Sequence, residues 1–336
     1  MAEDKGTNDM KLQRYQHNPI LEANPDKKWE SGASFNCGAV LGEDGLVYLL
    51  YRAIPKGYTR KPNGAGYSGY ISSIGCAVSE NGIAFARFDQ PVIQPTEDYD
   101  RFGCEDPRVT RLEIQGDVMY LITYTALFGP AYSGSNRVAL ASTEDFHTFH
   151  KHGVVIPGLN DKDAVIFPEL VNGRIAMLHR VEPNIQIVYF EDLEGLLHPR
   201  EDFWSEYRAS LKEFTVMRPK YEWESEKIGS GAPPIKTEEG WLLIYHGKDD
   251  KAVYRAGMAL LDLEEPSRVI ARSPYPILEP EEEYERVGDT ANVVFPGGAI
   301  VIDDTLYVYY GAADKCCCLA TAKLDDVLDY LAAFRE

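Results

Sequence analysis

One pattern of strands and turns occurs five times along the chain, and this repetition restricts the fold more than any other sequence feature. In each copy a small or polar residue leads into an apolar strand, a turn with Gly, Asn or Asp, and a second apolar strand with a polar end. The copies begin near residues 36, 104, 164, 230 and 291. A second hairpin-like unit follows each copy. Four strands in each of five units predict an all-β fold, a five-bladed β-propeller.

The repeats also bear on domain organisation. A blade cannot bury both of its faces alone, so the five copies are expected to pack as a single domain over residues 1–336. We interpret residues 1–17 as an N-terminal extension and residues 201–226 as an insertion between the third and fourth blades. Apolar residues at positions 324, 327, 328 and 331 predict a short C-terminal helix. A β-sandwich or two separate β domains are the alternatives.

The charge of the chain argues against two classes of partner. It has 53 acidic and 34 basic residues, a net charge of -19, which disfavours nucleic acid and anionic membranes. No apolar run approaches the roughly 18 residues of a membrane helix, and the first residues lack the apolar core of a signal peptide. The six cysteines form no CxxC pair, so we expect no metal site and predict a cytoplasmic location.

The polar ends of the repeats suggest where a ligand binds. Aligning the second strands matches Tyr51, Tyr124, His179, Tyr245 and Tyr309. The residues that follow them are Arg52, Thr125, Arg180, His246 and Tyr310. Equivalent strand ends of a propeller meet at one mouth of the central channel, and Arg and His are unusual in such apolar surroundings. The pattern favours a polar ligand pocket on the axis; strand ends wetted by channel water are the alternative.

Two adjacent carboxylates, Glu105 and Asp106, begin a predicted strand in the sequence GCEDPR at 103–108. Successive strand residues face opposite sides, so we expect only one carboxylate to point toward the axis. A turn-forming role for the pair is the alternative. Further acids near equivalent positions are Asp163, Asp249, Asp289 and Asp314, and basic candidates are Lys162, Arg180, Lys227 and His246.

This mixture of acids and cations favours one kind of glycoside chemistry. Cleavage of a glycoside needs an acid to protonate the leaving oxygen. Phosphate as the nucleophile needs cations to hold it against an acidic protein. Hydrolysis would instead need a second carboxylate to activate water. The residues therefore favour phosphorolysis over hydrolysis.

The chain resembles glycoside hydrolase family 130, the β-mannoside phosphorylases, along residues 18–331. The resemblance rests on the segments 34–40, 103–109, 162–180, 227–247, 253–280, 288–299 and 309–314. It implies a five-bladed propeller that cleaves β-mannosides with phosphate, inverts the anomeric centre and releases α-mannose 1-phosphate, in a reaction that also runs toward synthesis. The blade sequences are most similar to members that act on β-1,2-linked mannose.

The resemblance also implies a role for particular residues. Asp106 matches the single catalytic acid, whose proton reaches the glycosidic oxygen through the mannose 3-hydroxyl. The positions implied for phosphate are Lys162, Arg180, His246 and Tyr254. The positions implied for the mannoside are Asn36, Arg52, Glu105, Arg137, Lys227, Asp289 and Asp314.

The resemblance further implies the partners of the reaction. These are a manno-oligosaccharide with phosphate, or mannose 1-phosphate with an acceptor; phosphate is a co-substrate, and no metal or organic cofactor is expected. A homo-oligomer is compatible with the sequence. Two other functions stay open at this point: a β-mannosidase that uses water, and a carbohydrate-binding propeller without catalysis.

Overall fold

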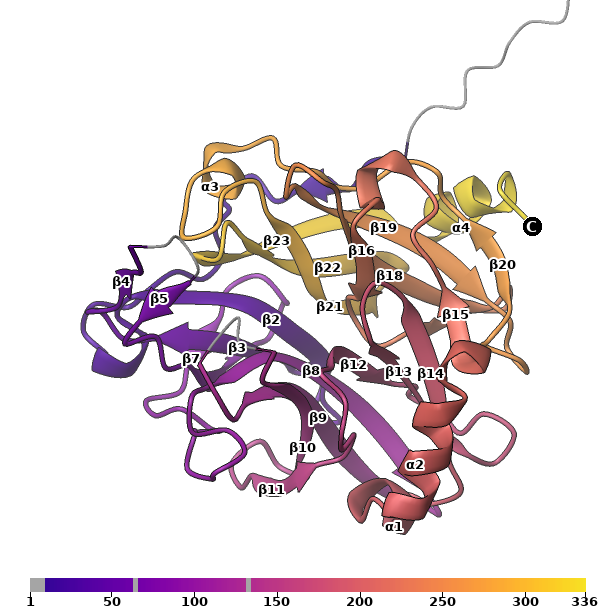
Figure 1. Cartoon of the computed structure of the whole chain (residues 1–336). Coiled ribbons are helices and arrows are strands. Elements are labelled where there is room, and N and C mark those ends of the chain that lie inside the picture. Colours follow the sequence, from indigo (N-terminus) through magenta and orange to yellow (C-terminus); the bar gives the residue numbers. More distant parts are fainter. Residues whose placement is uncertain (1–9, 63–65, 131–133) are drawn as a thin grey trace, which may run out of the picture.

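Five antiparallel sheets surround one axis in the computed structural model, which describes residues 10–62, 66–130 and 134–336. Within these residues the sheets follow one another around the ring in chain order, as the colours of Figure 1 show. The first strand of four blades, and β21 in the fifth, lies nearest the axis. The predicted five-bladed β-propeller is therefore confirmed.

The strands of the blades have the following bounds. The first blade contains β2 (Ala33–Leu41), β3 (Val47–Ile54), β6 (Ser73–Ser79) and β7 (Ala86–Arg87). The second contains β8 (Cys104–Ile114), β9 (Asp117–Leu127), β10 (Asn136–Thr143) and β11 (His150–Val154). The third contains β12 (Lys162–Ile166), β13 (Ile175–Arg180), β14 (Ile185–Phe190) and β15 (Thr215–Met217).

The fourth blade contains β16 (Lys227–Ser230), β18 (Trp241–Lys248), β19 (Tyr254–Leu261) and β20 (Val269–Arg272), with β17 (Ile235–Lys236) paired to β18. The fifth contains β21 (Val294–Ile302), β22 (Thr305–Ala312), β23 (Cys316–Lys323) and the N-terminal strand β1 (Gln13–Arg14). A small hairpin of β4 (Thr59–Arg60) and β5 (Tyr67–Ser68) lies between β3 and β6 in the chain.

The N-terminal segment closes the ring. Strand β1 pairs with β23, so the outermost strand of the last blade comes from the opposite end of the chain. Of the extension expected over residues 1–17, residues 1–9 lie outside the described part of the chain. The expected insertion at 201–226 holds a helix, but it also holds β15, the outermost strand of the third blade.

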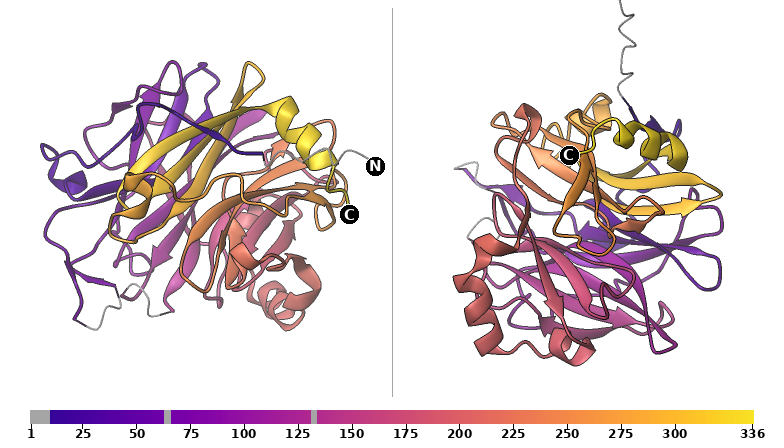
Figure 2. Two further views of the ribbon diagram at one scale, coloured as in Figure 1. Left: turned by 90° about the horizontal axis from the view of Figure 1, so that it is seen from above. Right: turned by 90° about the vertical axis from the view of Figure 1, so that its right-hand side faces the viewer.

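Short helices lie outside the blades (Figure 2). They are α1 (Leu193–Leu197), α2 (Glu201–Ala209), α3 (Glu283–Arg286) and α4 (Leu324–Ala332), with 3-10 turns η1 (Lys28–Glu30), η2 (Leu211–Phe214) and η3 (Glu222–Glu224). Helix α4 is the predicted C-terminal helix, and it buries Val327 and Leu331. None of the helices in the described residues has the length and apolar character needed to cross a membrane.

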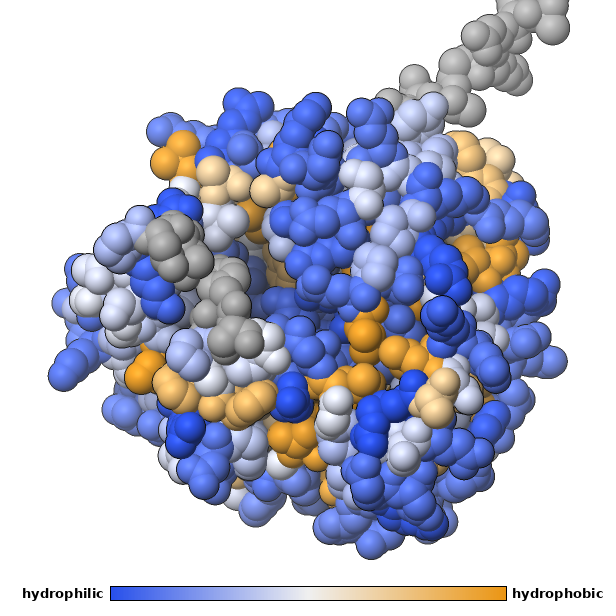
Figure 3. Space-filling model, in the orientation of Figure 1, coloured by the Kyte–Doolittle hydropathy of each residue, from blue (hydrophilic) through white to orange (hydrophobic). Residues whose placement is uncertain are grey.

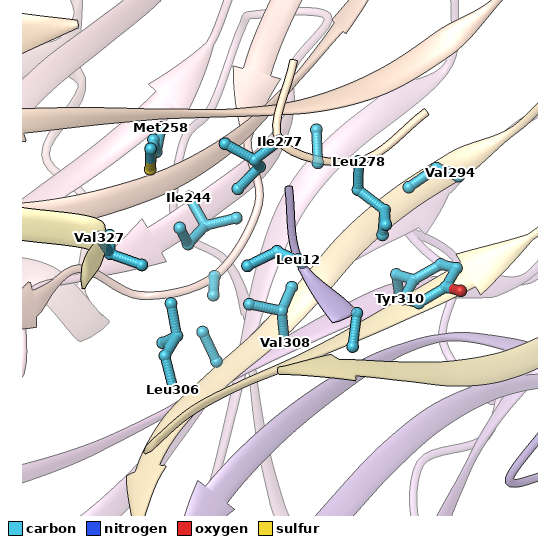
Figure 4. Packing of buried hydrophobic residues seen from close by; sticks show 14 of the residues in the cluster. Leu12, Ile244, Met258, Ile277, Leu278, Val294, Leu306, Val308, Tyr310 and Val327 are labelled. Carbon is cyan, nitrogen blue, oxygen red and sulfur yellow. The ribbon is translucent and has the colours of Figure 1, made fainter. Parts of the chain in front are cut away.

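The hydrophobic core is divided among the spaces between neighbouring blades. Figure 4 shows the cluster between the fourth and fifth blades, where Ile244 and Met258 face Leu306 and Val308. Leu12 from the N-terminal segment lies inside this cluster. Because the neighbouring blades cover both faces of a sheet, strands such as β3 are buried along their whole length.

A buried carboxylate ties the strands together in four of the blades. Each acid lies before the innermost strand and is at most 1% exposed. It accepts a hydrogen bond from a tyrosine on the middle of the sheet and pairs with a cation from the outermost strand. The sets are Glu30 with Tyr51 and Arg87, Asp100 with Tyr124 and Lys151, Glu224 with Tyr245 and Arg272, and Glu285 with Tyr310 and Arg14.

These acid–tyrosine–cation sets correct the sequence alignment of the fifth blade. The equivalent of Tyr51 is Tyr310, and not Tyr309, whose hydroxyl donates to the carbonyl of Gly82. Adjacent strand residues face opposite sides, and the chemical identity of two neighbouring tyrosines does not show which one faces the fourth blade. The residue that follows the matched aromatic is therefore Gly311, so Tyr310 belongs to the core and not to a polar ring on the axis.

Loss of the cation from one of these sets should destabilise the propeller. Arg14→Ala is expected to lower the free energy of unfolding by about 3 kcal/mol, because it leaves the carboxylate of Glu285 buried without its counter-ion. Lys11→Ala is the control: the Lys11–Glu279 pair is 38% and 35% exposed, and such pairs contribute about 0–1 kcal/mol. Urea unfolding of both variants measures the difference, and equal losses would contradict the role given to Glu285.

Candidate active site

Irregularities in three innermost strands turn side chains toward the axis. The pairing of β2, β8 and β12 with their neighbours shifts register at Asn36, Asp106 and Asp163. These residues have φ values of 48°, 49° and 57°, in the left-handed region that Asn and Asp tolerate better than most residues. A bulge of this kind re-aims a side chain out of the regular alternation. The same device therefore directs one polar side chain inward from each of three blades.

A cavity of about 440 Å³ lies near the centre of the propeller. Figure 3 shows this face of the molecule hollowed near its middle, with hydrophilic residues around much of the opening. Among the described residues, five cations and four carboxylates line the cavity; they are Arg52, Lys162, Arg180, Lys227 and Lys248, and Glu105, Asp106, Glu182 and Asp314. All five blades contribute to its wall.

The side of the cavity formed by the first, second and fifth blades carries three of the carboxylates, and we call it the acidic wall (Glu105, Asp106, Asp314). Asp106 Oδ1 accepts hydrogen bonds from Asn36 Nδ2 at 2.8 Å and from Arg52 Nη1 at 3.2 Å. The same guanidinium binds Glu105 through Nη2. One arginine therefore holds both carboxylates that the sequence motif places side by side. The expectation that only one of them points toward the axis was wrong, because the bulge at Asp106 breaks the alternation.

The surroundings of the two adjacent carboxyls push their pKa values apart. Burial raises the pKa of Glu105, and the charge of Asp106 adds to this effect, although Arg52 opposes it. Burial also acts to raise the pKa of Asp106, but the cations of Arg52, Lys162 and Arg108 outweigh it and hold that pKa below its ordinary value. Asp106 is therefore the more acidic member of the pair.

The third and fourth blades form the opposite side, which we call the basic wall (Lys162, Arg180, Lys227, Lys248). Lys162 and Arg180 face each other across the β12–β13 ladder. Glu182 accepts hydrogen bonds from Arg180 at 3.1 Å and from Lys227 at 2.7 Å. Burial and the charge of Arg180 lower the pKa of Lys227 despite its contact with Glu182. This concentration of positive charge is unusual for a chain with a net charge of -19.

Asp163 lies behind the basic wall. Its side chain is fully buried, with Oδ2 2.7 Å from Arg180 Nη1 and Oδ1 3.4 Å from Arg108 Nη2. Burial acts to raise the pKa of Asp163, but Arg180, Lys162 and His246 hold it well below the ordinary range. The carboxylate is therefore the counter-ion of Arg180 and does not face the cavity.

The structure brings nine of the twelve predicted site residues to the cavity. These are Asn36, Arg52, Glu105, Asp106, Lys162, Arg180, Lys227, Tyr254 and Asp314. His246 differs from the expectation, because its ring is fully buried behind Arg180, with Nε2 3.2 Å from Nη1 of that arginine. Burial and the nearby cations lower the pKa of His246 to about 4, so the ring is neutral near pH 7.

Asp289 and Arg137 also lie away from the cavity wall. Asp289 accepts a hydrogen bond from Tyr58 at 2.5 Å and pairs with Lys315 at 2.8 Å, so it anchors the segment that leads into β4. The Arg137 guanidinium lies over the ring of Phe128, 4.4 Å from its centroid. In both cases an adjacent residue lines the cavity instead. Thr290 follows Asp289, and Asn136 precedes Arg137.

Sequence reasoning did not single out two charged residues that line the cavity on the side of the basic wall. Glu182 lies two residues after Arg180, and Lys248 lies two residues after His246. For Lys248, which lies in β18 with His246, the alternation of strand residues was the available signal. Glu182 lies beyond the end of β13, where alternation gives no signal. Strand alternation did not predict that Tyr70 and Phe295 line the cavity. Tyr70 lies in a loop, and Phe295 lies next to a bulge in β21.

Comparisons with known proteins agree with this geometry. A family model described as β-1,4-mannooligosaccharide phosphorylase, of glycoside hydrolase family 130, matches residues 11–333. A 1,2-β-oligomannan phosphorylase from Thermoanaerobacter sp. (strain X514) is 41% identical over 318 residues, 95% of this chain and 99% of the relative. A β-1,2-mannobiose phosphorylase from the same organism is 42% identical, over 90% of this chain and 94% of the relative.

A solved structure shows the same architecture. The β-1,2-mannobiose phosphorylase of Listeria innocua, in complex with β-1,2-mannobiose, superposes with a TM-score of 0.77 at 30% identity and covers 96% of this chain and 100% of that chain. Family, relatives and structure all extend over almost the whole length. The chain belongs to glycoside hydrolase family 130.

Proposed function

We propose that this protein is an inverting phosphorylase that cleaves β-1,2-linked manno-oligosaccharides with inorganic phosphate and releases α-mannose 1-phosphate. The reaction also runs toward synthesis, from mannose 1-phosphate and a mannoside acceptor. The relatives named for β-1,2-linked substrates, at 41% and 42% identity, support this linkage over the β-1,4 linkage in the description of the family model.

One observation carries the proposal: the two opposite walls of a single cavity bear opposite chemical character. The basic wall offers an anionic nucleophile the charge-assisted hydrogen bonds that it needs. The acidic wall offers the proton donor that a departing sugar oxygen needs. A water-using β-mannosidase does not need the basic wall, and a binding propeller needs neither a buried acid nor a phosphate site.

The residues then have distinct tasks in the reaction. Phosphate held by Lys162, Arg180 and Tyr254 attacks the anomeric carbon, and the bond from that carbon to the leaving oxygen breaks. A proton that originates at the Asp106 carboxyl reaches the leaving oxygen, so Asp106 ends as a carboxylate. Asn36 and Arg52 orient Asp106, while Glu105, Lys227 and Asp314 bind the sugar. His246 and Asp163 support Arg180 from behind.

Phosphate binding prepares Asp106 for this step. Lys162 Nζ lies 3.7 Å from Asp106 Oδ2 and also lines the cavity. An anion on the basic wall competes for Lys162 and adds negative charge near Asp106. Both effects favour the protonated carboxyl and oppose the cations that lower the pKa of Asp106.

The proposal requires no metal or organic cofactor, since phosphate is the co-substrate. It includes no nucleic acid or membrane as partner. The cytoplasmic location and a homo-oligomeric state stay predictions.

Phosphate dependence tests the function directly. With β-1,2-mannobiose, we expect mannose and mannose 1-phosphate only when phosphate is present, and Asp106→Asn is expected to lower turnover by about 10²–10⁴-fold. Chromatography of the products with and without phosphate is the measurement, with β-1,4-mannobiose as the linkage control. Equal release of mannose without phosphate would show a hydrolase instead.

Two matched substitutions separate the walls of the cavity. Arg180→Lys keeps a charge opposite Asp163 but loses the guanidinium fork, so the phosphate KM should rise about tenfold while the mannoside KM changes little. Arg52→Lys should do the reverse, because Arg52 holds Glu105 and Asp106. Initial rates over a matrix of both substrates give the four KM values. The division of tasks is wrong if both variants raise the same KM.

The position of Asn36 depends on the absence of a side chain at residue 311. A Cβ at Gly311 would lie 1.9 Å from Asn36 Oδ1, so Gly311→Ala must displace the amide that donates to Asp106. We expect kcat to fall by about 10–100-fold, as small misplacements at the chemistry cause. Gly195→Ala in α1 is the control, since its added Cβ has an ordinary contact at 3.4 Å. Near-normal kcat in Gly311→Ala would contradict the positioning role of Asn36.

A further inference from the structure

The third blade departs from the acid–tyrosine–cation sets of the other four. Its buried acid is Asp161, and its middle strand offers His179 where the other blades have a tyrosine. Among the described residues, no Arg or Lys forms an ion pair with Asp161. The third partner is instead Tyr207 of α2, whose hydroxyl lies 2.6 Å from His179 Nε2.

The hydrogen bonds of this set form a continuous chain. His179 Nδ1 lies 2.5 Å from Asp161 Oδ2, and Tyr207 Oη donates to the carbonyl of Ile187 at 2.9 Å. Asp161, His179 and Tyr207 are 1%, 0% and 4% exposed. A buried chain of polar groups with every member bonded fixes the positions of its members.

This chain ends directly behind two residues of the basic wall. Asp161 precedes Lys162, and His179 precedes Arg180, which are partners in the β12–β13 ladder. Asp161 Oδ1 also accepts the backbone N–H of Arg180 at 2.9 Å. The negative charge of Asp161 favours the charged form of the Arg180 side chain. The backbone that carries both cations is therefore held by Asp161 and His179.

We infer that Asp161, His179 and Tyr207 are positioning residues for the phosphate-binding cations, and that helix α2 sets the affinity for phosphate through Tyr207. The inference rests on the proposed phosphate site at Lys162 and Arg180. Helix α2 lies on the outer side of the third blade (Figure 1), so Tyr207 reaches the cations through His179 and does not touch the cavity.

Tyr207→Phe tests this inference, because it removes the hydroxyl and keeps the ring. The phosphate KM should rise about three- to tenfold, with kcat and the mannoside KM within twofold of wild type. The stabilisation by added phosphate, measured as a shift in Tm, should shrink in parallel, which gives a readout independent of turnover.

The matched control is Tyr310→Phe, which removes the equivalent hydroxyl of the fifth blade, where Arg14 still neutralises Glu285. It should lower Tm and leave the phosphate KM unchanged. His179→Gln should show the same split as Tyr207→Phe, which keeps the inference testable if one variant does not fold.

Three outcomes have distinct meanings. A phosphate KM in Tyr207→Phe within twofold of wild type, with Tm lowered as in Tyr310→Phe, overturns the inference, since the set is then structural only. Equal rises in the phosphate and mannoside KM overturn it as well. Wild-type turnover that does not depend on phosphate overturns the proposed function itself.

Discussion

The geometry of the cavity depends on the contacts of one buried carboxylate, that of Asp163. Arg108 comes from the second blade, Arg180 from the third and His246 from the fourth, and all three meet this one buried carboxylate. Two guanidinium groups in so confined a place would repel each other and lose hydration without a fixed anion between them. Asp163 therefore joins three blades at the axis and leaves Arg180 in position at the cavity.

The bulges explain how a regular propeller produces so irregular a site. Regular alternation would send each residue of an innermost strand toward one or the other neighbouring blade. The left-handed residues Asn36, Asp106 and Asp163 break this rule at equivalent places. Gly311 completes the arrangement, because only a residue without a side chain leaves room for Asn36. The strands thus form a rigid frame, and single residues with positive φ set the direction in which the polar side chains point.

Much of this arrangement could be predicted from the sequence, because it follows from repetition and alternation. The repeats predicted five blades, and the polar strand ends predicted that Arg52 and Arg180 meet at one cavity. The failures have a common physical cause. Adjacent residues point in different directions, and the sequence does not reveal which of two neighbours faces the site: Tyr309 was aligned in place of Tyr310, and Asp289 and Arg137 were expected where Thr290 and Asn136 lie. His246 was expected to bind phosphate, but its ring is buried behind Arg180.

The charges of the basic wall also bear on selectivity. Glu182 binds Arg180 and Lys227, whose side chains are 2% and 15% exposed, while its own side chain is 51% exposed. Burial acts to raise the pKa of Glu182, but Lys227 and Arg180 lower it, so Glu182 stays charged. An anion that binds Arg180 therefore competes with Glu182 for this guanidinium. A phosphate dianion has more charge and more acceptor oxygens for this competition than a single carboxylate has. Glu182 thus offsets part of the positive charge of the basic wall, which favours an oxyanion of higher charge over a single carboxylate at Arg180.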